Sequence, residues 1–222
     1  MRETNLTRLD NTNTTKKSTI FLHYIFLFRD LKYAISKYAK GTVLDIGCGN
    51  KPYISFFPTE IKYIGCDIIQ SSKNQVDVIC EATNIPLEDE HFDTVFSTQT
   101  IEHVYNHKKM LSEAHRLLKP QGYIIFSGPM YWPHHEEPYD FFRFTKYGFE
   151  NLLIETGFEV REILPNGGKW ALWGVVTLQT LPQWLANLRI IKWTINTICY
   201  KLDTKYPDYK NTMNFVVVAQ KK

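Results

Sequence analysis

The chain has 222 residues, 44% of them hydrophobic and 14% aromatic, and a formal net charge of +3 at pH 7. This length suits a single domain with a sizeable core, and the small charge without a long basic run argues against a nucleic-acid partner. The four cysteines form no CxxC pair, which disfavours a disulfide framework and favours a reducing, cytoplasmic location.

The first elements follow a polar N-terminal segment. Residues 1–19 are rich in Thr, Asn and Lys and are expected to be a disordered lead-in to a single domain over residues 20–222. A helix is expected from about Thr19 to Tyr38. Its apolar start, residues 20–28, lacks the cleavage site of a signal peptide and is too short to span a bilayer.

Seven apolar, strand-like runs then alternate with helical ones. The expected strands cover residues 42–46, 62–68, 76–80, 92–97, 123–128, 158–164 and 214–220, with clear helices at 107–118 and 145–155. Alternation of this kind predicts an α/β fold, a doubly wound, mostly parallel seven-stranded sheet of the Rossmann-like type. We expect the last strand to be antiparallel.

A tryptophan-rich segment precedes the last strand. Residues 170–188 carry no charged side chain, but Pro182 and several amides argue against a membrane-spanning helix. We therefore expect a helical insert or lid over residues 167–205. Its tryptophans suit the core or a dimer surface, and the sharper alternative is a peripheral membrane contact through residues 170–193.

The stretch VLDIGCGN, residues 43–50, ends the first expected strand in a glycine turn. Doubly wound sheets bind nucleotides at the carboxyl ends of their strands, and glycines there allow a close approach to the backbone. The NAD fingerprint requires a third glycine at the position that Pro52 occupies. An NAD-dependent oxidoreductase is therefore disfavoured, and it stays open only because the fold permits it.

Five segments in order resemble the class I S-adenosylmethionine-dependent methyltransferases, and in particular the methyltransferase type 11 group. They are VLDIGCGN (43–50), KYIGCDI (62–68), EATNIPLEDEHFDTVFS (81–97), TIEHV (100–104) and LLKPQGYIIFSGP (117–129). The resemblance covers about residues 42–164. It departs from the family at Lys51, where many members have a third glycine.

The resemblance implies S-adenosyl-L-methionine as cofactor and assigns roles by position. The turn at 47–49 would pack against the methionine part, Asp67 would hold the ribose, and Glu81 would bind the adenine edge. The full set of implied cofactor-binding residues is Asp45, Gly47, Cys48, Gly49, Asp67, Ile68, Glu81, Ala82 and Gln99.

Polar and aromatic side chains gather in residues 129–145, beside the expected methyl site. The run HEEPYDFFRFT at 135–145 resembles a signature of bacterial family members. Histidine titrates near neutral pH, so His135 is the first choice for a base. The remaining candidates are Glu136 and Asp140 as catalytic residues and Trp132, Tyr139 and Arg143 as substrate-binding residues.

Some of these residues have a second interpretation. Asp140 and Arg143 would also suit an ion pair that only shapes the loop, and His103 is expected to pack under the cofactor. The spacing of His134 and His135 matches no common zinc pattern, so no metal is expected.

The sequence therefore predicts a methyltransferase acting on a small or lipid-linked acceptor. The polar-aromatic loop suits a hydroxylated acceptor such as a sugar. The alternative is a non-catalytic, cofactor-binding partner subunit in a complex. The expected partners are the acceptor alone, with no nucleic acid, in a monomer or homodimer that is cytoplasmic or peripheral to the membrane.

Overall fold

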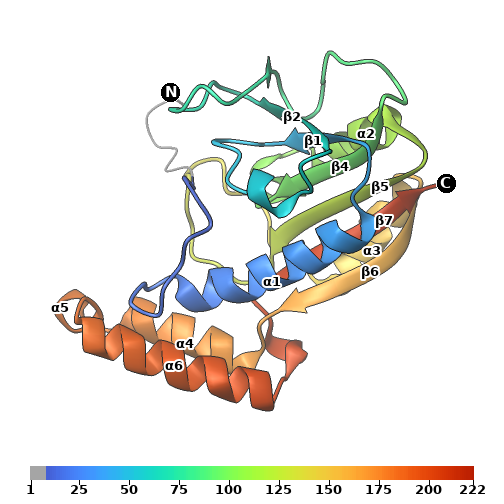
Figure 1. The fold of residues 1–222 in the computed structure, drawn as a ribbon. Coiled ribbons are helices and arrows are strands. Elements are labelled where there is room, and N and C mark those ends of the chain that lie inside the picture. Colours follow the sequence, from blue (N-terminus) through green and yellow to red (C-terminus); the bar gives the residue numbers. More distant parts are fainter. Residues whose placement is uncertain (1–8) are drawn as a thin grey trace.

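The computed structural model describes residues 9–222. The elements in chain order are α1 (Phe21–Tyr38), β1 (Thr42–Ile46), η2 (Ile54–Phe56), β2 (Lys62–Asp67), β3 (Val78–Ile79), β4 (Phe92–Thr98), η3 (Ile101–His103), α2 (His107–Leu117), β5 (Leu118–Pro129), α3 (Lys146–Glu155), β6 (Phe158–Asn166), α4 (Lys169–Thr180), α5 (Gln183–Ala186), α6 (Arg189–Lys205), η4 (Tyr209–Asn211) and β7 (Asn214–Lys221) (Figure 1).

The strands form one seven-stranded sheet in the order β3-β2-β1-β4-β5-β7-β6. Strands β1 to β5 pair in parallel, whereas β7 runs antiparallel to both β5 and β6. The predicted Rossmann-like sheet and its antiparallel last strand are thus confirmed. The order reverses between β1 and β4, and the carboxyl ends of these strands therefore border the crevice where doubly wound sheets bind ligands.

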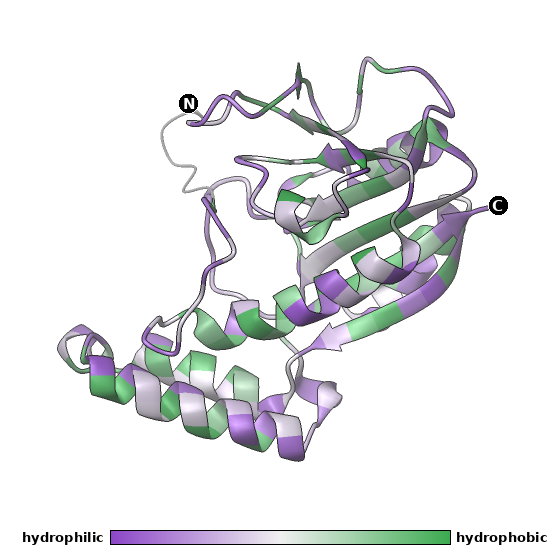
Figure 2. Cartoon of the chain, viewed as in Figure 1, coloured by the Kyte–Doolittle hydropathy of each residue, from purple (hydrophilic) through white to green (hydrophobic). Residues whose placement is uncertain are grey.

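Helices cover both faces of the sheet. On one face α1 packs Leu31 and Ile35 against Val43 and Ile125, and on the other α2 and α3 contribute a larger apolar cluster around Phe149. Figure 2 shows hydrophobic residues concentrated in the central strands and in alternating bands along α1. This pattern follows from burial of the strands on both sides, while a helix buries only one stripe.

The N-terminal segment is described from residue 9 onward. Residues 9–19 contain no helix or strand, but Asn50 donates to Asp10 at 2.9 Å and Asn196 donates to the carbonyl of Ser18 at 2.7 Å. This part of the predicted lead-in therefore packs against the domain. The rest of that prediction, for residues 1–8, lies outside the described residues.

The predicted insert forms three helices, α4 to α6, which lie beside α1 at one end of the molecule (Figure 1). Its core contains Ala171, Val175 and Cys199, packed against Phe26 of α1. Asp203 fastens it by accepting backbone hydrogen bonds at the start of α4, including one from Gly168 at 2.9 Å. Among residues 9–222, none of the helices has the length and apolar character needed to cross a bilayer.

Three of the four tryptophans in residues 167–205 are too exposed to belong to the hydrophobic core. Trp173, Trp184 and Trp193 have exposed fractions of 56%, 71% and 47%. Tryptophan at this level of exposure points to a surface with a use other than core packing.

Candidate active site

A cleft of about 580 Å³ opens at the carboxyl ends of β1, β2 and β4. Its size is typical of small-molecule sites. All nine residues predicted to bind the cofactor line it: Asp45, Gly47, Cys48, Gly49, Asp67, Ile68, Glu81, Ala82 and Gln99. The topology therefore brings together residues that are spread over 55 positions of the sequence, from Asp45 to Gln99.

The glycine turn after β1 is fixed by the backbone of β2. The N–H groups of Gly47 and Cys48 both donate to the carbonyl of Cys66, at 2.8 and 3.1 Å. Gly47 has a φ of +80°, and a Cβ there would lie 2.3 Å from Oγ1 of Thr100. The missing side chain at this position is thus required by the packing of the protein itself, whether or not a ligand is bound.

Asp67 ties the end of β2 to this turn. One carboxylate oxygen accepts the N–H of Gly49 at 3.0 Å, and the other accepts the N–H of Ile68 at 2.7 Å. Both bonds hold the carboxylate at the cleft wall, in the position from which it would accept hydrogen bonds from a ribose. The geometry therefore fits a nucleoside-type cofactor.

Asp45 is buried beneath the turn and accepts the hydroxyl hydrogen of Tyr63 at 2.6 Å. Burial raises the pKa of Asp45 to about 7. Its hydrogen-bond partner is thus a hydroxyl group of the protein itself.

Lys51 occupies the position where many members of the family have a third glycine. Its backbone adopts a φ of +49°, a region that favours glycine, and its side chain is nevertheless buried. The ammonium group donates to Asp77 at 2.5 Å, and the same carboxylate oxygen accepts the N–H of Gly65 at 2.7 Å. An ion pair between the loop and the start of β3 thus accompanies the left-handed backbone.

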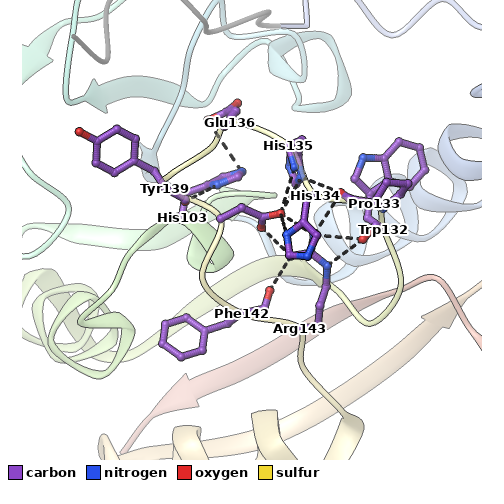
Figure 3. Close-up of polar contacts among 10 residues, drawn as sticks. His103, Trp132, Pro133, His134, His135, Glu136, Tyr139, Phe142 and Arg143 are labelled. Carbon is purple, nitrogen blue, oxygen red and sulfur yellow. Dashed lines mark hydrogen bonds and ion pairs between the residues drawn. The ribbon is translucent and has the colours of Figure 1, made fainter.

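The loop after β5 lines the same cleft from the β4–β5 side of the sheet. Trp132, His135, Glu136 and Tyr139 line it, together with His103 from η3. Figure 3 shows His103, Glu136 and His135 between Tyr139 on one side and Trp132 on the other. Four of the six predicted catalytic and substrate-binding residues therefore share the cleft with the predicted cofactor residues.

Asp140 and Arg143 do not line the cleft. Asp140 has a side-chain exposure of 1% and accepts hydrogen bonds from Arg143 at 2.6 and 2.7 Å and from the N–H of His135 at 3.1 Å. Burial alone would raise the pKa of Asp140, but these bonds lower it to about 2. Arg143 also donates to the carbonyl of Trp132. These contacts support the second interpretation, an ion pair that shapes the loop.

The rings of two histidines meet in the part of the cleft that this loop lines. The rings of His103 and His135 lie 4.7 Å apart between centroids, at 77°. Nδ1 of His103 contacts the carbonyl of Tyr139 at 2.9 Å, and Nδ1 of His135 contacts the carbonyl of Pro133 at 3.2 Å. Burial and the neighbouring His103 lower the pKa of His135.

Glu102 is fully buried, and one of its carboxylate oxygens lies within 4.8 Å of a ring nitrogen of each histidine. Neither carboxylate oxygen has a hydrogen-bond partner among the described residues. Burial raises the pKa of Glu102 to about 8. Glu102 belongs to the TIEHV segment, and the family resemblance implied no role for it.

Two residues of α1, His23 and Tyr24, also line the cleft and were not among the predicted site residues. The ring of His23 packs on Trp132, with centroids 4.2 Å apart. Burial lowers the pKa of His23 to about 3, so this ring is neutral. No pattern within the helix signalled that its first turn would reach the site.

An open sheet of this order, with a glycine turn after β1 and an acid at the tip of β2, is the arrangement that the resemblance to class I S-adenosylmethionine-dependent methyltransferases implied. Residues 44–126 match the family described as a methyltransferase domain. For this part of the chain, the predicted likeness to S-adenosylmethionine-dependent methyltransferases, with S-adenosyl-L-methionine as cofactor, is thus confirmed.

Among curated proteins, tRNA (carboxymethyluridine(34)-5-O)-methyltransferase of Arabidopsis thaliana is 33% identical over 94 residues. The match covers 38% of this chain and 23% of that protein. This chain therefore shares only a minor part of that relative's length.

Two solved structures show the same fold. The [4+2]-cyclase SpnF has a TM-score of 0.60 at 15% identity, with 98% of this chain and 88% of that chain covered. Phosphoethanolamine N-methyltransferase 2 of Haemonchus contortus, in complex with S-adenosyl-L-methionine, has a TM-score of 0.54 at 20% identity, with coverage of 86% and 52%. SpnF is named as a cyclase and the Haemonchus contortus protein as a methyltransferase, so the fold alone does not define the reaction.

Proposed function

We propose that the chain transfers a methyl group from S-adenosyl-L-methionine to a hydroxyl group of a small or lipid-linked acceptor, with a sugar hydroxyl favoured. The observation that carries the proposal is a single cleft that the predicted cofactor residues share with His135, Glu136 and two aromatic rings of the loop after β5. We call the part lined by this loop the acceptor end. When bound, the cofactor supplies a methyl group that is already activated as a sulfonium.

The residues of the chain position the acceptor and receive its proton. Trp132 and Tyr139 would stack on a sugar ring and exclude water, which favours transfer by holding the reactants in line. A hydroxyl carries a proton at neutral pH, so a base is required. His135 faces the cleft and is the candidate for this role, with Glu136 beside it.

A transfer assay tests the proposal directly. Labelled methyl groups from S-adenosyl-L-methionine should appear on free or lipid-linked sugars offered as a panel, as base-stable ethers. Label on an amine or a carboxylate alone would contradict the hydroxyl assignment. Cofactor binding without transfer to any acceptor class, together with dimerisation or complex formation, would favour the alternative of a non-catalytic partner subunit.

Nucleic acid is the second candidate acceptor, because the Arabidopsis relative is named for a tRNA uridine. That match is confined to 94 residues, and this chain has a net charge of only +3. Unfractionated tRNA, offered as an acceptor in the same assay, distinguishes the nucleic-acid acceptor from the sugar acceptor. Label in tRNA, and none in the sugar panel, would replace the sugar proposal.

We further propose that the tip of the insert contacts an anionic lipid surface, which would give access to a lipid-linked acceptor. Trp184, Leu188 and Ile190 are exposed there, next to Arg189. No acidic residue occurs between Glu162 and Asp203, whereas this stretch contains Lys169, Arg189, Lys192 and Lys201. Exposed tryptophan beside basic residues suits the headgroup region of a bilayer.

The double variant Trp184→Ser, Ile190→Ser is expected to weaken binding to vesicles of phosphatidylglycerol and phosphatidylcholine by at least about tenfold, because burial of each apolar side chain contributes about 1.5–3 kcal/mol. Co-sedimentation with the vesicles measures the effect. Ile154→Ser, at an exposed position of α3, is the matched control and should bind like the unchanged chain. Equal binding of all three proteins, or none by the unchanged chain, would exclude the lipid contact.

A further inference from the structure

Three side chains with metal-ligating atoms converge at the acceptor end of the cleft. Glu102 and His103 come from η3, directly after β4, and His135 comes from the loop after β5. One candidate ligand atom from each of the three lies within 4.8 Å of the others. The sequence separates His135 from the other two by more than thirty positions, so no ligand spacing was visible in it.

The carboxylate of Glu102 is the first observation that points to a ligand. The residue has an exposed fraction of 0%, and both oxygens are without a hydrogen-bond partner among the described residues. Burying a polar group without a partner is costly, and buried carboxylates in proteins are usually paired or bind a metal. A cation between this carboxylate and the cleft would remove that cost.

The histidines provide a second, independent observation. Nδ1 of each ring faces a backbone carbonyl, Tyr139 O for His103 and Pro133 O for His135. A carbonyl only accepts, so Nδ1 acts as the donor in both contacts, and in the neutral form of each ring the lone pair is on Nε2. Histidine ligands of metals are typically oriented by such a hydrogen bond from the other ring nitrogen.

We propose that Glu102, His103 and His135 bind one divalent transition-metal cation, Zn²⁺ or an ion of similar preference, with an open coordination position towards the cleft. Two imidazoles and one carboxylate are a ligand set of catalytic zinc sites. Bonds of about 2.0–2.2 Å would draw these atoms closer together than the present limit of 4.8 Å. The inference changes the expectation of no metal that the sequence alone gave.

The catalytic consequence rests on the proposed function. An acceptor hydroxyl bound at the open position would become more acidic, as water does on zinc. The O–H bond would break with its electron pair kept by oxygen, and the proton would pass to Glu136, whose carboxylate lies 3.9 Å from Nε2 of His103. The oxygen would form the bond to the methyl carbon as the carbon–sulfur bond breaks, with the electron pair of that bond going to sulfur. No electron is transferred. His135 would then act by holding the cation instead of accepting the proton itself.

Metal binding is measured on the full chain after removal of bound metal with a chelator, by titration calorimetry with Zn²⁺ and with Mg²⁺. We expect one equivalent of Zn²⁺ to bind and Mg²⁺ to bind far more weakly. Glu102→Gln and His135→Ala should each weaken Zn²⁺ binding by at least about 100-fold, since loss of a mere outer-shell partner already costs about 10–100-fold. His134→Ala, at a neighbouring side chain with 82% exposure, is the matched control and should bind normally.

The outcomes separate this inference from the proposed function. Binding of S-adenosylhomocysteine is measured in parallel, with and without chelator, and should be the same in both. Absence of stoichiometric Zn²⁺ binding, or undiminished binding by the folded His135→Ala variant, overturns the metal site and leaves methyl transfer standing. If the unchanged chain does not bind S-adenosylhomocysteine, the proposed function is wrong. The calorimetric result for Zn²⁺ is a separate measurement and stands by itself.

Discussion

Replacing Asp67 with alanine is expected to weaken the binding of S-adenosylhomocysteine by about 100-fold or more. The carboxylate anchors Gly49 and faces the cleft at the tip of β2. The variant loses this anchor together with the proposed bonds to the ribose, and hydrogen bonds to a charged group contribute about 1.5–3 kcal/mol each. Titration calorimetry gives the dissociation constant, and a thermal melt verifies that the variant is folded.

Two further variants make this result specific. Asp67→Asn keeps the shape and one acceptor oxygen, so its affinity should fall between those of the unchanged chain and the alanine variant. Asp89→Ala removes an exposed carboxylate that pairs with Arg116 and does not line the cleft, and its affinity should not change. If folded Asp67→Ala binds S-adenosylhomocysteine within twofold of the unchanged chain, the ribose assignment is wrong.

Replacing His135 with alanine is expected to reduce turnover by about 10²–10⁴-fold, the range associated with loss of a general base. The affinity for S-adenosylhomocysteine should stay within about threefold, because His135 lies in the loop at the acceptor end, among a different set of residues from the cofactor turn. Initial rates with a competent acceptor, together with calorimetry, separate the two effects.

His134→Ala is the control for this experiment, because the His134 side chain is mostly exposed. Its Nδ1 lies 3.7 Å from a carboxylate oxygen of Asp140. This variant should retain turnover. Unchanged turnover of His135→Ala would remove this residue from the mechanism. Adding a chelator to the unchanged chain then distinguishes the two roles of His135, because a free base works without metal, whereas a ligand does not.

The sheet could be predicted from the sequence because its strands are short, continuous apolar runs that end at glycine or polar residues. Element ends were less predictable. Strand β5 begins at Leu118 instead of Tyr123, because Leu118 already pairs with Phe92 of β4. Strand β3 is reduced to Val78–Ile79, where it pairs with the end of β2.

The cofactor end of the cleft was predictable because its residues follow strand ends, and parallel strands bring those ends to one edge. The sequence did not predict why position 47 must be glycine. A side chain there would collide with Thr100, and this contact depends on tertiary packing. The acceptor end depends on how the loop after β5 folds over η3. An acid and an arginine three residues apart fit both a site and a structural ion pair, and only the bonds of Asp140 and Arg143 distinguish them.

The direction in which the side chains of α4 point could not be predicted from the sequence. Apolar residues surround α4 on most sides, so the sequence does not indicate which of them face inward. Ala171 and Val175 do, because they meet α1, whereas Trp173 on the same helix remains exposed.

The central claim is that the cleft binds S-adenosylmethionine, and a thermal melt with S-adenosylhomocysteine, with NAD in parallel, tests it most directly. At a hundredfold excess over the dissociation constant, a specific ligand stabilises the folded chain by about 2.7 kcal/mol, which is a rise of roughly 5–10 °C in Tm for a domain of this size. We expect this rise with S-adenosylhomocysteine and none with NAD. No rise with S-adenosylhomocysteine, or a rise with NAD instead, would contradict the assignment of the cleft.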